Sequence, residues 1–471
     1  MLQIYNTISR KKETFKPIHK KDVNLYYCGP TVYWVQHIGN LRGATCTDII
    51  VRSLNYLGYQ VQYVRNYTDV GHLTSDSDIG IDKMEKAAKR EKLDPLDIAQ
   101  KYINLYEKDT HDLNLLEPNV KPRATEHIDQ IISMINTLIE KDFAYTSDLA
   151  IYFDVSKAKD YTHLSGQILK ENITGAGTGE VKDEQKRSPY DFALWFFKAG
   201  THSNTLQYWP SPFQSKLAKD GEGFPGWHIE CSAMSKKHLG DTLDIHIGGI
   251  EHIPVHHTNE IAQSESANNV KFVNYWMHNE HLLVNNKKMS KSEGTGYSLS
   301  EIKEKGFAPI ILRFFFLQAH YRSKLNFTWE ALDAAQNSYN HLCKKIEALD
   351  ISTVGEINDK FKDKFIKTIE DDFNTPKALA IIQELLKSNI QDNSKYATIL
   401  DFDRLLGLNF NLIKPRDIDQ ATREQIESLI QERKIAREEK NWKKADEIRD
   451  ELTKINILIE DKDDETYWRL N

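Results

Sequence analysis

The sequence predicts an α/β fold whose core is a Rossmann-like parallel sheet. Residues 24–27 form a short run typical of a buried strand, and residues 41–57 repeat apolar positions with helical spacing. Residues 60–64 then alternate as a second strand. A strand, a helix and a strand in so short a space indicate a right-handed βαβ unit with parallel strands. Ligands bind such sheets at the carboxyl ends of the strands. The chemically active residues expected at that edge are Cys28, His37 and Thr68.

The composition is that of an ordinary globular protein, with 40% hydrophobic residues, 28% charged residues and a net charge of −7. No run reaches the roughly 18 apolar residues that span a bilayer, and no secretory apolar segment follows Met1. We therefore expect a cytoplasmic monomer that does not associate with membranes. The four cysteines are too few and too scattered for a disulfide framework, which leaves core residues, nucleophiles or metal ligands. The negative charge does not favour a nucleic-acid partner, although a local basic surface would suffice.

The chain of 471 residues is long enough for two to four domains. Residues 77–115 and 125–141 are helical in pattern, and residues 174–179 form a glycine-rich loop. Residues 243–249 continue the sheet, and helices dominate from about residue 308 onward. The expected segments are the first half of the Rossmann-like domain (1–120), a connective insertion (121–210), the second half of that domain (211–275), a mobile-loop region (276–320), a helical bundle (321–412) and a small C-terminal domain (416–471).

Two segments far apart in the chain suggest a grip on a nucleoside triphosphate. The turn at residues 37–40 places backbone N–H groups and the positive end of a helix where an anion would lie, and His37 can add a donor. Lys288 and Lys291 can neutralise a triphosphate from a loop that includes Ser290 and ends in a glycine. The alternatives are an ordinary helix start and a solvated lysine-rich loop. Found together, the two segments favour the phosphate grip.

A second group of residues suggests a metal site. His256 and Glu260 stand four apart, so on a helix they share one face. With Cys28 and Cys231 they could surround Zn²⁺ with nitrogen, sulfur and oxygen ligands. The alternatives are core cysteines and a helix-surface His–Glu pair. Other histidines that would compete as ligands are His246, His252 and His257.

The order of these motifs resembles that of cysteinyl-tRNA synthetases, which are class I aminoacyl-tRNA synthetases. The segments that carry the resemblance are residues 28–33, 37–40, 226–234, 256–260 and 288–292, and the likeness covers essentially the whole chain. It implies that Cys28, Cys231, His256 and Glu260 bind one Zn²⁺ whose open position takes the thiolate of the substrate. Zinc prefers a thiolate to a serine hydroxyl, so a separate editing domain should be unnecessary.

The resemblance also implies roles for residues around these motifs, and it shows where this chain departs from the family. Asn40 replaces the usual second histidine of the phosphate turn, Ile247 begins the expected glycine run, and Glu251 stands where the family has aspartate. The implied amino-acid pocket consists of Gly29, Thr68 and Trp227. The implied catalytic residues are His37, Asn40, Lys288 and Lys291. The implied ATP-binding residues are His37, Gly39, Asn40, Gly248, Gly249, Glu251, Lys288, Ser290 and Lys291.

The C-terminal residues test whether RNA is a partner. Two apolar stripes flank a stretch in which basic residues surround Trp442, a combination that suits single-stranded bases. The alternative is a helical hairpin with solvated charges and Trp442 as its core. The first stripe consists of Ile426, Leu429 and Ile430, and the second of Ala445, Ile448, Leu452 and Ile455. The resemblance extends to an anticodon-binding domain whose contacts would be Arg437, Trp442 and Asp461.

The expected activity is therefore that of a cysteine–tRNA ligase. ATP, accompanied by Mg²⁺, and L-cysteine would form cysteinyl-adenylate, and the cysteine would pass to the 3′ terminal adenosine of tRNA(Cys). Two alternatives remain, a ligase that joins cysteine to an amino sugar and an inactive RNA-binding relative. The apparent C-terminal module argues against the first, and the intact loop lysines and metal candidates argue against the second.

Overall fold

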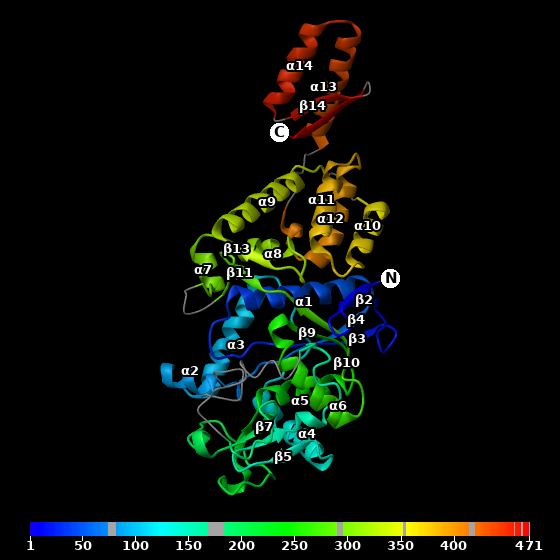
Figure 1. Cartoon of the computed structure of the whole chain (residues 1–471). Coiled ribbons are helices and arrows are strands. Elements are labelled where there is room, and N and C mark those ends of the chain that lie inside the picture. The colour runs from blue at the N-terminus through cyan, green and yellow to red at the C-terminus, as the bar shows by residue number, and fades with distance from the viewer. Residues whose placement is uncertain are drawn as a thin grey trace. The chain divides into compact units, whose positions relative to one another are not determined.

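The computed structural model describes residues 1–73, 82–167, 183–289, 295–351, 355–413, 420–455, 457–462 and 465–470 (Figure 1). The chain divides into two compact units. The first consists of Met1–Leu332 with Ile369–Thr375, and the second of Asp333–Thr368 with Pro376–Asn471. In the described part of the chain, every helix is too short or too polar to cross a membrane.

The first unit is built on a four-stranded sheet in which all neighbouring strands are parallel. Its order is β10 (Val273–Asn279), β9 (Leu243–Gly249), β3 (Asp22–Tyr27) and β4 (Gln60–Arg65). The three strands expected from the sequence are confirmed, each within two residues of its predicted bounds. β9 is buried along its length, as is typical of a parallel strand covered on both faces.

Three helices cover this sheet. α1 (Ile38–Tyr56) runs along one side of the strands, and α5 (Trp227–Leu239) and α6 (His256–Asn268) lie on the other (Figure 1). α1 begins three residues before its predicted start, because the side chain of His37 caps it by accepting the N–H of Asn40.

The charged segment that follows β4 contains two helices rather than one. α2 (Lys83–Glu91) begins after the capping carboxylate of Asp82, and α3 (Pro95–Asp112) begins after that of Asp94. Lys92 ends α2 in the left-handed conformation, which breaks the predicted continuous helix.

A second sheet follows in the chain. After η1 (Ala124–His127) and α4 (Ile128–Glu140), it contains the antiparallel strands β5 (Ala144–Thr146), β6 (Ala150–Phe153), β7 (Phe192–Phe197) and β8 (Gly223–Pro225). β8 lies beyond residue 210, where the sequence predicted the insertion to end. The glycine-rich loop predicted at 174–179 lies outside the described residues.

The remaining elements of the first unit are short. Two strands pair near the N-terminus, and a small sheet leads to the loop predicted to grip phosphate. The elements are β1 (Gln3–Asn6), β2 (Lys11–Thr14), η2 (Val155–Lys157), η4 (Gly200–His202), η5 (Lys219–Gly221), η6 (Ile250–His252), β11 (Leu282–Val284), β12 (Lys287–Lys288), α7 (Leu299–Glu304), α8 (Pro309–Leu317) and β13 (Leu325–Phe327).

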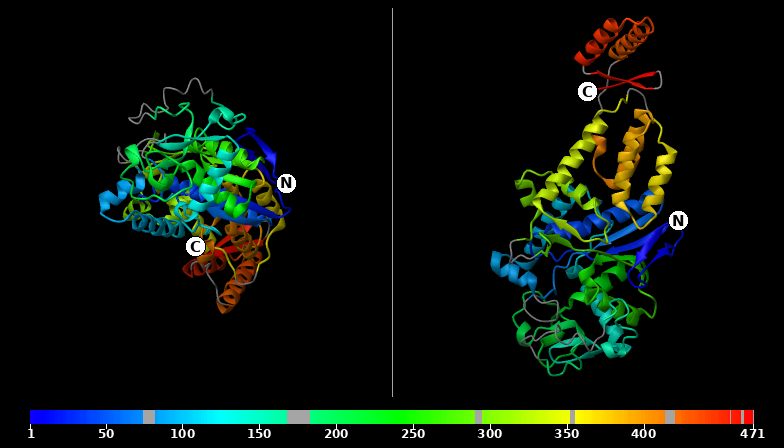
Figure 2. Two further views of the ribbon diagram at one scale, coloured as in Figure 1. Left: turned by 90° about the horizontal axis from the view of Figure 1, so that it is seen from below. Right: turned by 45° about the horizontal axis from the view of Figure 1, so that its top comes forward.

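The later part of the chain is helical, as predicted, but it ends in a hairpin of strands that the sequence did not predict. Ile426, Leu429, Ile448 and Leu452 pack with Ile457 in one core. The right-hand view of Figure 2 shows the last two helices of the chain packed on the strand hairpin. Ile455 is 40% exposed, so its predicted place in the second stripe was wrong. The elements are α9 (Trp329–Glu347), α10 (Asp359–Ile369), α11 (Thr375–Lys387), α12 (Asp392–Leu406), η7 (Phe410–Leu412), α13 (Gln420–Glu438), α14 (Trp442–Lys454), β14 (Ile457–Lys462) and β15 (Glu465–Leu470).

Candidate active site and metal centre

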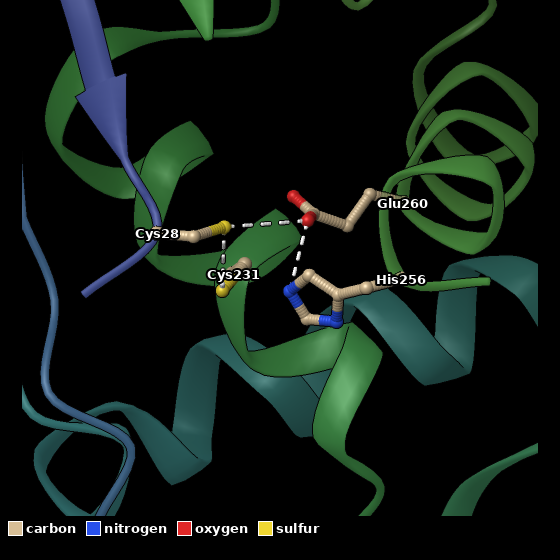
Figure 3. A group of neighbouring side chains, drawn as sticks. All are labelled: Cys28, Cys231, His256 and Glu260. Atoms are coloured by element: carbon tan, nitrogen blue, oxygen red, sulfur yellow. Dashed lines mark hydrogen bonds and ion pairs between the residues drawn. The ribbon is translucent and has the colours of Figure 1, made fainter. Parts of the chain in front are cut away.

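Four side chains that can bind a metal lie together at the carboxyl edge of the parallel sheet. Cys28 follows β3, Cys231 lies in α5, and His256 and Glu260 lie one turn apart in α6 (Figure 3). Their ligand atoms all lie within 4.8 Å of one another. The two sulfur atoms are 3.8 Å apart, and both cysteines are free thiols. His256 Nε2 lies 3.0 Å from Glu260 Oε1.

This spacing fits a tetrahedral metal ion. Zn–S bonds of about 2.3 Å place two sulfur ligands about 3.8 Å apart, which is also the separation of Cys28 Sγ and Cys231 Sγ. Cys28 Sγ lies 3.6 Å from Glu260 Oε1, so the carboxylate completes the cluster at a similar spacing. Two thiols, an imidazole and a carboxylate form a donor set that suits Zn²⁺. The buried cluster is therefore suited to binding a metal ion.

Burial controls the protonation of these ligands. Desolvation raises the pKa of the Cys28 thiol and that of the Glu260 carboxyl well above their ordinary values. Burial, followed by the neighbouring imidazole of His228, lowers the pKa of His256 well below its ordinary value. The free cluster therefore favours neutral groups. A divalent cation would reverse this preference for the thiols and the carboxyl, because it stabilises their charged forms.

A second set of ligand atoms shares Cys28 and Glu260 with the first. His246 and His257 complete this set within the same 4.8 Å limit. His257 Nε2 lies 3.5 Å from Cys28 Sγ, and His246 Nε2 lies 2.9 Å from Glu260 Oε2. His257 Nδ1 lies 2.7 Å from His278 Nε2, and His256 Nδ1 lies 2.8 Å from His228 Nδ1, so one imidazole of each set has a second histidine as its outer partner. Of the three histidines that the sequence left as competing ligands, the structure thus places His246 and His257 within reach of the metal cluster, whereas His252 belongs to neither set.

The residues expected to line an amino-acid pocket lie close to these ligands. Gly29 follows Cys28 and donates its N–H to Asn66 Oδ1 at 2.9 Å. Thr68 is buried just beyond β4 and donates its N–H to the carbonyl of Pro30. Trp227 is half-buried, and its ring stacks on that of His256 with 4.2 Å between centroids. Trp227 therefore packs against a residue of the metal cluster and is not buried in an ordinary apolar core.

The phosphate turn holds His37 in a defined orientation. His37 Nδ1 accepts the N–H of Asn40 at 3.2 Å, so a neutral ring carries its proton on Nε2, the nitrogen that can donate to a phosphate. The N–H of Ile38 donates to the carbonyl of Tyr297 at 2.7 Å. Two of the backbone N–H groups expected to face an anion are therefore used within the chain. The turn therefore offers fewer free backbone N–H groups than the sequence predicted.

The two predicted phosphate-binding segments lie against each other. A Cβ atom at Gly39 would lie 2.1 Å from Met289 Cε, so a larger residue there would displace the Met289 side chain. Ser298, which follows the lysine-containing loop in the sequence, forms an antiparallel bridge with His37. Lys288 is exposed at the end of β12. Ser290 and Lys291 lie outside the described residues.

The segment expected to meet adenosine ends β9. A Cβ atom at Gly248 would lie 2.7 Å from His252 Nδ1, and one at Gly249 would lie 2.3 Å from Glu251 Oε1. Gly248 therefore needs to be glycine for space, because the imidazoles around it are packed, whereas at Gly249 the flexible Glu251 side chain could move aside. The Glu251 side chain is 49% exposed, which leaves its carboxylate accessible to a ligand. His252 belongs to neither metal set.

The predicted anticodon contacts lie in the C-terminal hairpin domain. Trp442 begins α14 and is 60% exposed, so the alternative in which it forms the hairpin core was wrong. Arg437 Nη1 lies 2.6 Å from Asp461 Oδ2. Arg433, which the sequence analysis did not select, binds Asp461 through two hydrogen bonds of 2.8 and 2.9 Å. Asp461 is therefore held by two arginines before any RNA binds. The contact with Arg433 depends on the unpredicted β14, which explains why the sequence pattern missed it.

Comparisons with known proteins identify the family to which these domains belong. Residues 14–337 match the family described as the class I (C) catalytic domain of tRNA synthetases. Residues 364–408 match a DALR domain, and residues 419–469 match a cysteinyl-tRNA ligase anticodon-binding domain. A methionyl-tRNA synthetase structure from Mycobacterium tuberculosis shares the fold with a TM-score of 0.54 and 13% identity, over 82% of this chain and 90% of that one.

The fold and these matches define the class of protein, a class I aminoacyl-tRNA synthetase. The chain is 42% identical to a cysteine–tRNA ligase of Treponema denticola over 99% of both chains. It is also 42% identical to cysteine–tRNA ligase 1 of Burkholderia lata, over 98% of this chain and 95% of that protein. The chain belongs to the cysteine–tRNA ligase family.

Proposed function

We propose that this chain activates L-cysteine with ATP to form cysteinyl-adenylate and then transfers the cysteine to the 3′ terminal adenosine of tRNA(Cys). The observation that carries the proposal is the buried cluster of Cys28, Cys231, His256 and Glu260 at the sheet edge that also holds the phosphate turn. Such an edge is where parallel sheets bind their ligands.

The cluster accounts for the choice of amino acid. A bound Zn²⁺ would supply a position that takes a thiolate in preference to a hydroxyl. Cys28 and Cys231 provide two soft sulfur donors, and His256 and Glu260 complete the set. Trp227, stacked on His256, closes one side of the pocket and excludes water from it.

The chain's own residues supply the electrostatics of adenylate formation. Nε2–H of His37 donates to a phosphate oxygen as negative charge builds during displacement of pyrophosphate. Lys288 and Lys291 neutralise the triphosphate together with Mg²⁺, and Ser290 adds a hydroxyl. Asn40 donates from its amide where a second histidine would stand. Gly248, Gly249 and Glu251 receive the adenosine at the end of β9.

The acceptor is selected by residues of the second compact unit. Arg437, Trp442 and Asp461 contact the anticodon, with the exposed indole stacking on a base. A monomeric state and a cytoplasmic location remain expectations from the sequence.

The test is ATP–pyrophosphate exchange with purified protein, followed by charging of a tRNA(Cys) transcript. We expect exchange that depends on cysteine and is at least about 1,000-fold weaker with serine, because a thiolate and a hydroxyl differ strongly as zinc ligands. Comparable exchange with serine would refute selection by the metal. Exchange without tRNA charging, but with transfer to an amino sugar, would establish the alternative ligase. No exchange with any amino acid would indicate an inactive relative.

A further inference from the structure

The helix α2 carries an exposed basic surface that the proposed chemistry does not use. α2 packs beside α3 at one side of the first unit (Figure 1). The exposed basic residues of this surface are Lys86, Lys89, Arg90 and Lys92. Among the residues that the structure describes, no acid forms an ion pair with any of the three lysines. Glu85 of the same helix is buried. In a chain of net charge −7, this surface is a local concentration of positive charge, which is what a nucleic-acid partner requires.

Both ends of α2 contact residues that border the candidate active site. At its start, Lys83 Nζ lies 2.5 Å from His72 Nε2, and the His72 ring stacks on that of Trp227 with 3.9 Å between centroids. At its end, Arg90 Nη2 donates to the carbonyl of Tyr33 at 3.3 Å. Tyr33 belongs to the segment that joins the first metal ligand to the phosphate turn. The exposed face of α2 therefore lies next to the space in which the two reactants would meet.

Arg90 presents a planar cation that is already held in place. Its Cζ lies 3.9 Å from the centroid of the Trp34 ring, and Nη2 donates to Glu91 Oε1 at 2.6 Å. Glu91 is also bound by Lys101 Nζ at 2.6 Å, so its charge is neutralised within the chain. The Arg90 side chain is still 36% exposed, and Trp34 is 37% exposed. Unpaired bases stack on aromatic rings and on guanidinium planes, so a flat cation beside exposed lysines suits single-stranded RNA.

The occupant of this surface follows from the proposed function, on which this inference rests. Transfer requires the terminal ribose of the tRNA to reach the carbonyl carbon of the activated cysteine, between the metal cluster and the phosphate turn. A tRNA ends in a single-stranded 3′ segment, so the nucleotides before the terminal adenosine approach along the border of that space. We propose that the basic surface of α2 binds this single-stranded 3′ segment. Lys86 and Lys89 pair with its phosphates, and Arg90, supported by Trp34, stacks on a base.

The test measures the Kd of the full chain for two RNAs over a range of salt concentrations. One RNA is a tRNA(Cys) transcript, and the other is the same transcript without its single-stranded 3′ segment. The double variant Lys86→Gln with Lys89→Gln removes two charges and keeps residues that favour a helix. We expect it to bind the full transcript about tenfold more weakly, with a slope of log Kd against log salt that is smaller by about 1.4, because each phosphate contact with a single strand contributes about 0.7.

Two readouts should not change in this double variant. It should bind the shortened transcript as tightly as the wild type does, because the phosphates that the two lysines contact are missing from that RNA. Cysteine-dependent pyrophosphate exchange should also stay at the wild-type rate, because that reaction involves no RNA.

The double variant Lys20→Gln with Lys21→Gln is the matched control. Both lysines are exposed and directly precede β3, at the sheet edge opposite the site and about 20 Å from it by the length of that strand. This control removes the same charge and should bind both RNAs as the wild type does. Arg90→Lys keeps the charge and removes the plane, so it should weaken binding of the full transcript without changing the salt slope. It provides the readout if the α2 double variant does not fold.

Two results would overturn the inference. One is unchanged binding of the full transcript by the α2 variants. The other is an equal weakening with the shortened transcript or in the Lys20 and Lys21 control, since both would show that the lysines act only through the overall charge. Absence of cysteine-dependent exchange in the wild type would instead refute the proposed function, because the binding measurements require no catalysis.

Discussion

Replacing Cys231 with serine tests which of the two ligand sets holds the metal. The sets share Cys28 and Glu260, and only the first contains Cys231 and His256. Structural zinc sites bind with roughly 10–16 kcal/mol, so loss of one ligand in four removes on the order of 3 kcal/mol. That value corresponds to an affinity about 100-fold lower, since each 1.4 kcal/mol is about a factor of ten.

The assay measures bound metal by elemental analysis and affinity by competition with a chelating dye. Cys231→Ser should lose metal under competition, whereas His257→Asn should weaken binding only about tenfold, because His257 then acts only as an outer partner of Cys28 Sγ from 3.5 Å. His257→Asn is therefore the matched control. Full retention by Cys231→Ser together with loss by His257→Asn would refute the first set and establish the second.

Three further predictions concern other parts of the chain. Lys288→Ala should lower kcat for pyrophosphate exchange about 100- to 1,000-fold with unchanged metal content, because loss of this exposed lysine removes only charge stabilisation in the transition state. Exchange at the wild-type rate would exclude a role of Lys288 in stabilising the phosphate charge. Arg433→Gln should raise the KM for tRNA about tenfold or more and leave exchange unchanged, because it frees Asp461 from a bond of 2.8 Å; an exchange defect would contradict this. Burial raises the pKa of Asp82 from 3.8 to about 7, so the folded chain holds this proton longer than the unfolded chain does. The free energy of unfolding should therefore fall by up to about 4 kcal/mol as pH rises from 4 to 7, and Asp82→Asn should flatten the urea-unfolding profile over that range. An identical slope in both proteins would exclude Asp82 as the cause.

Local patterns predicted most of the sheet, and the resemblance to the family selected all four residues of the first ligand set. A strand such as 60–64 can be predicted from alternation alone, and residues 256 and 260 share a helix face at any position in a fold. The hairpin of β14 and β15 was missed because its stability comes from pairing between two strands, which neither segment encodes alone. The ion pair between Asp461 of β14 and Arg433 of α13 was missed for the same reason, because it joins two separate elements.

The boundary of α1 was missed for a similar reason. The start of the helix depends on a capping hydrogen bond between His37 and Asn40, which hydrophobic periodicity does not report. The exposure of Trp442 and of Ile455, at the two ends of α14, likewise depends on which face of that helix meets the strands.

The sequence by itself determined the chemical types at the site, the parallel arrangement of the strands and, through its ordered motifs, the family. These are properties of neighbouring residues and of spacing along one element. The tertiary structure alone decided that sulfur atoms 203 residues apart in the chain lie 3.8 Å from each other, that Gly39 meets Met289, and that the Glu230 carboxyl is fully buried. Distances between elements and the loss of solvent around a charge arise only when the elements pack, and no local pattern contains them.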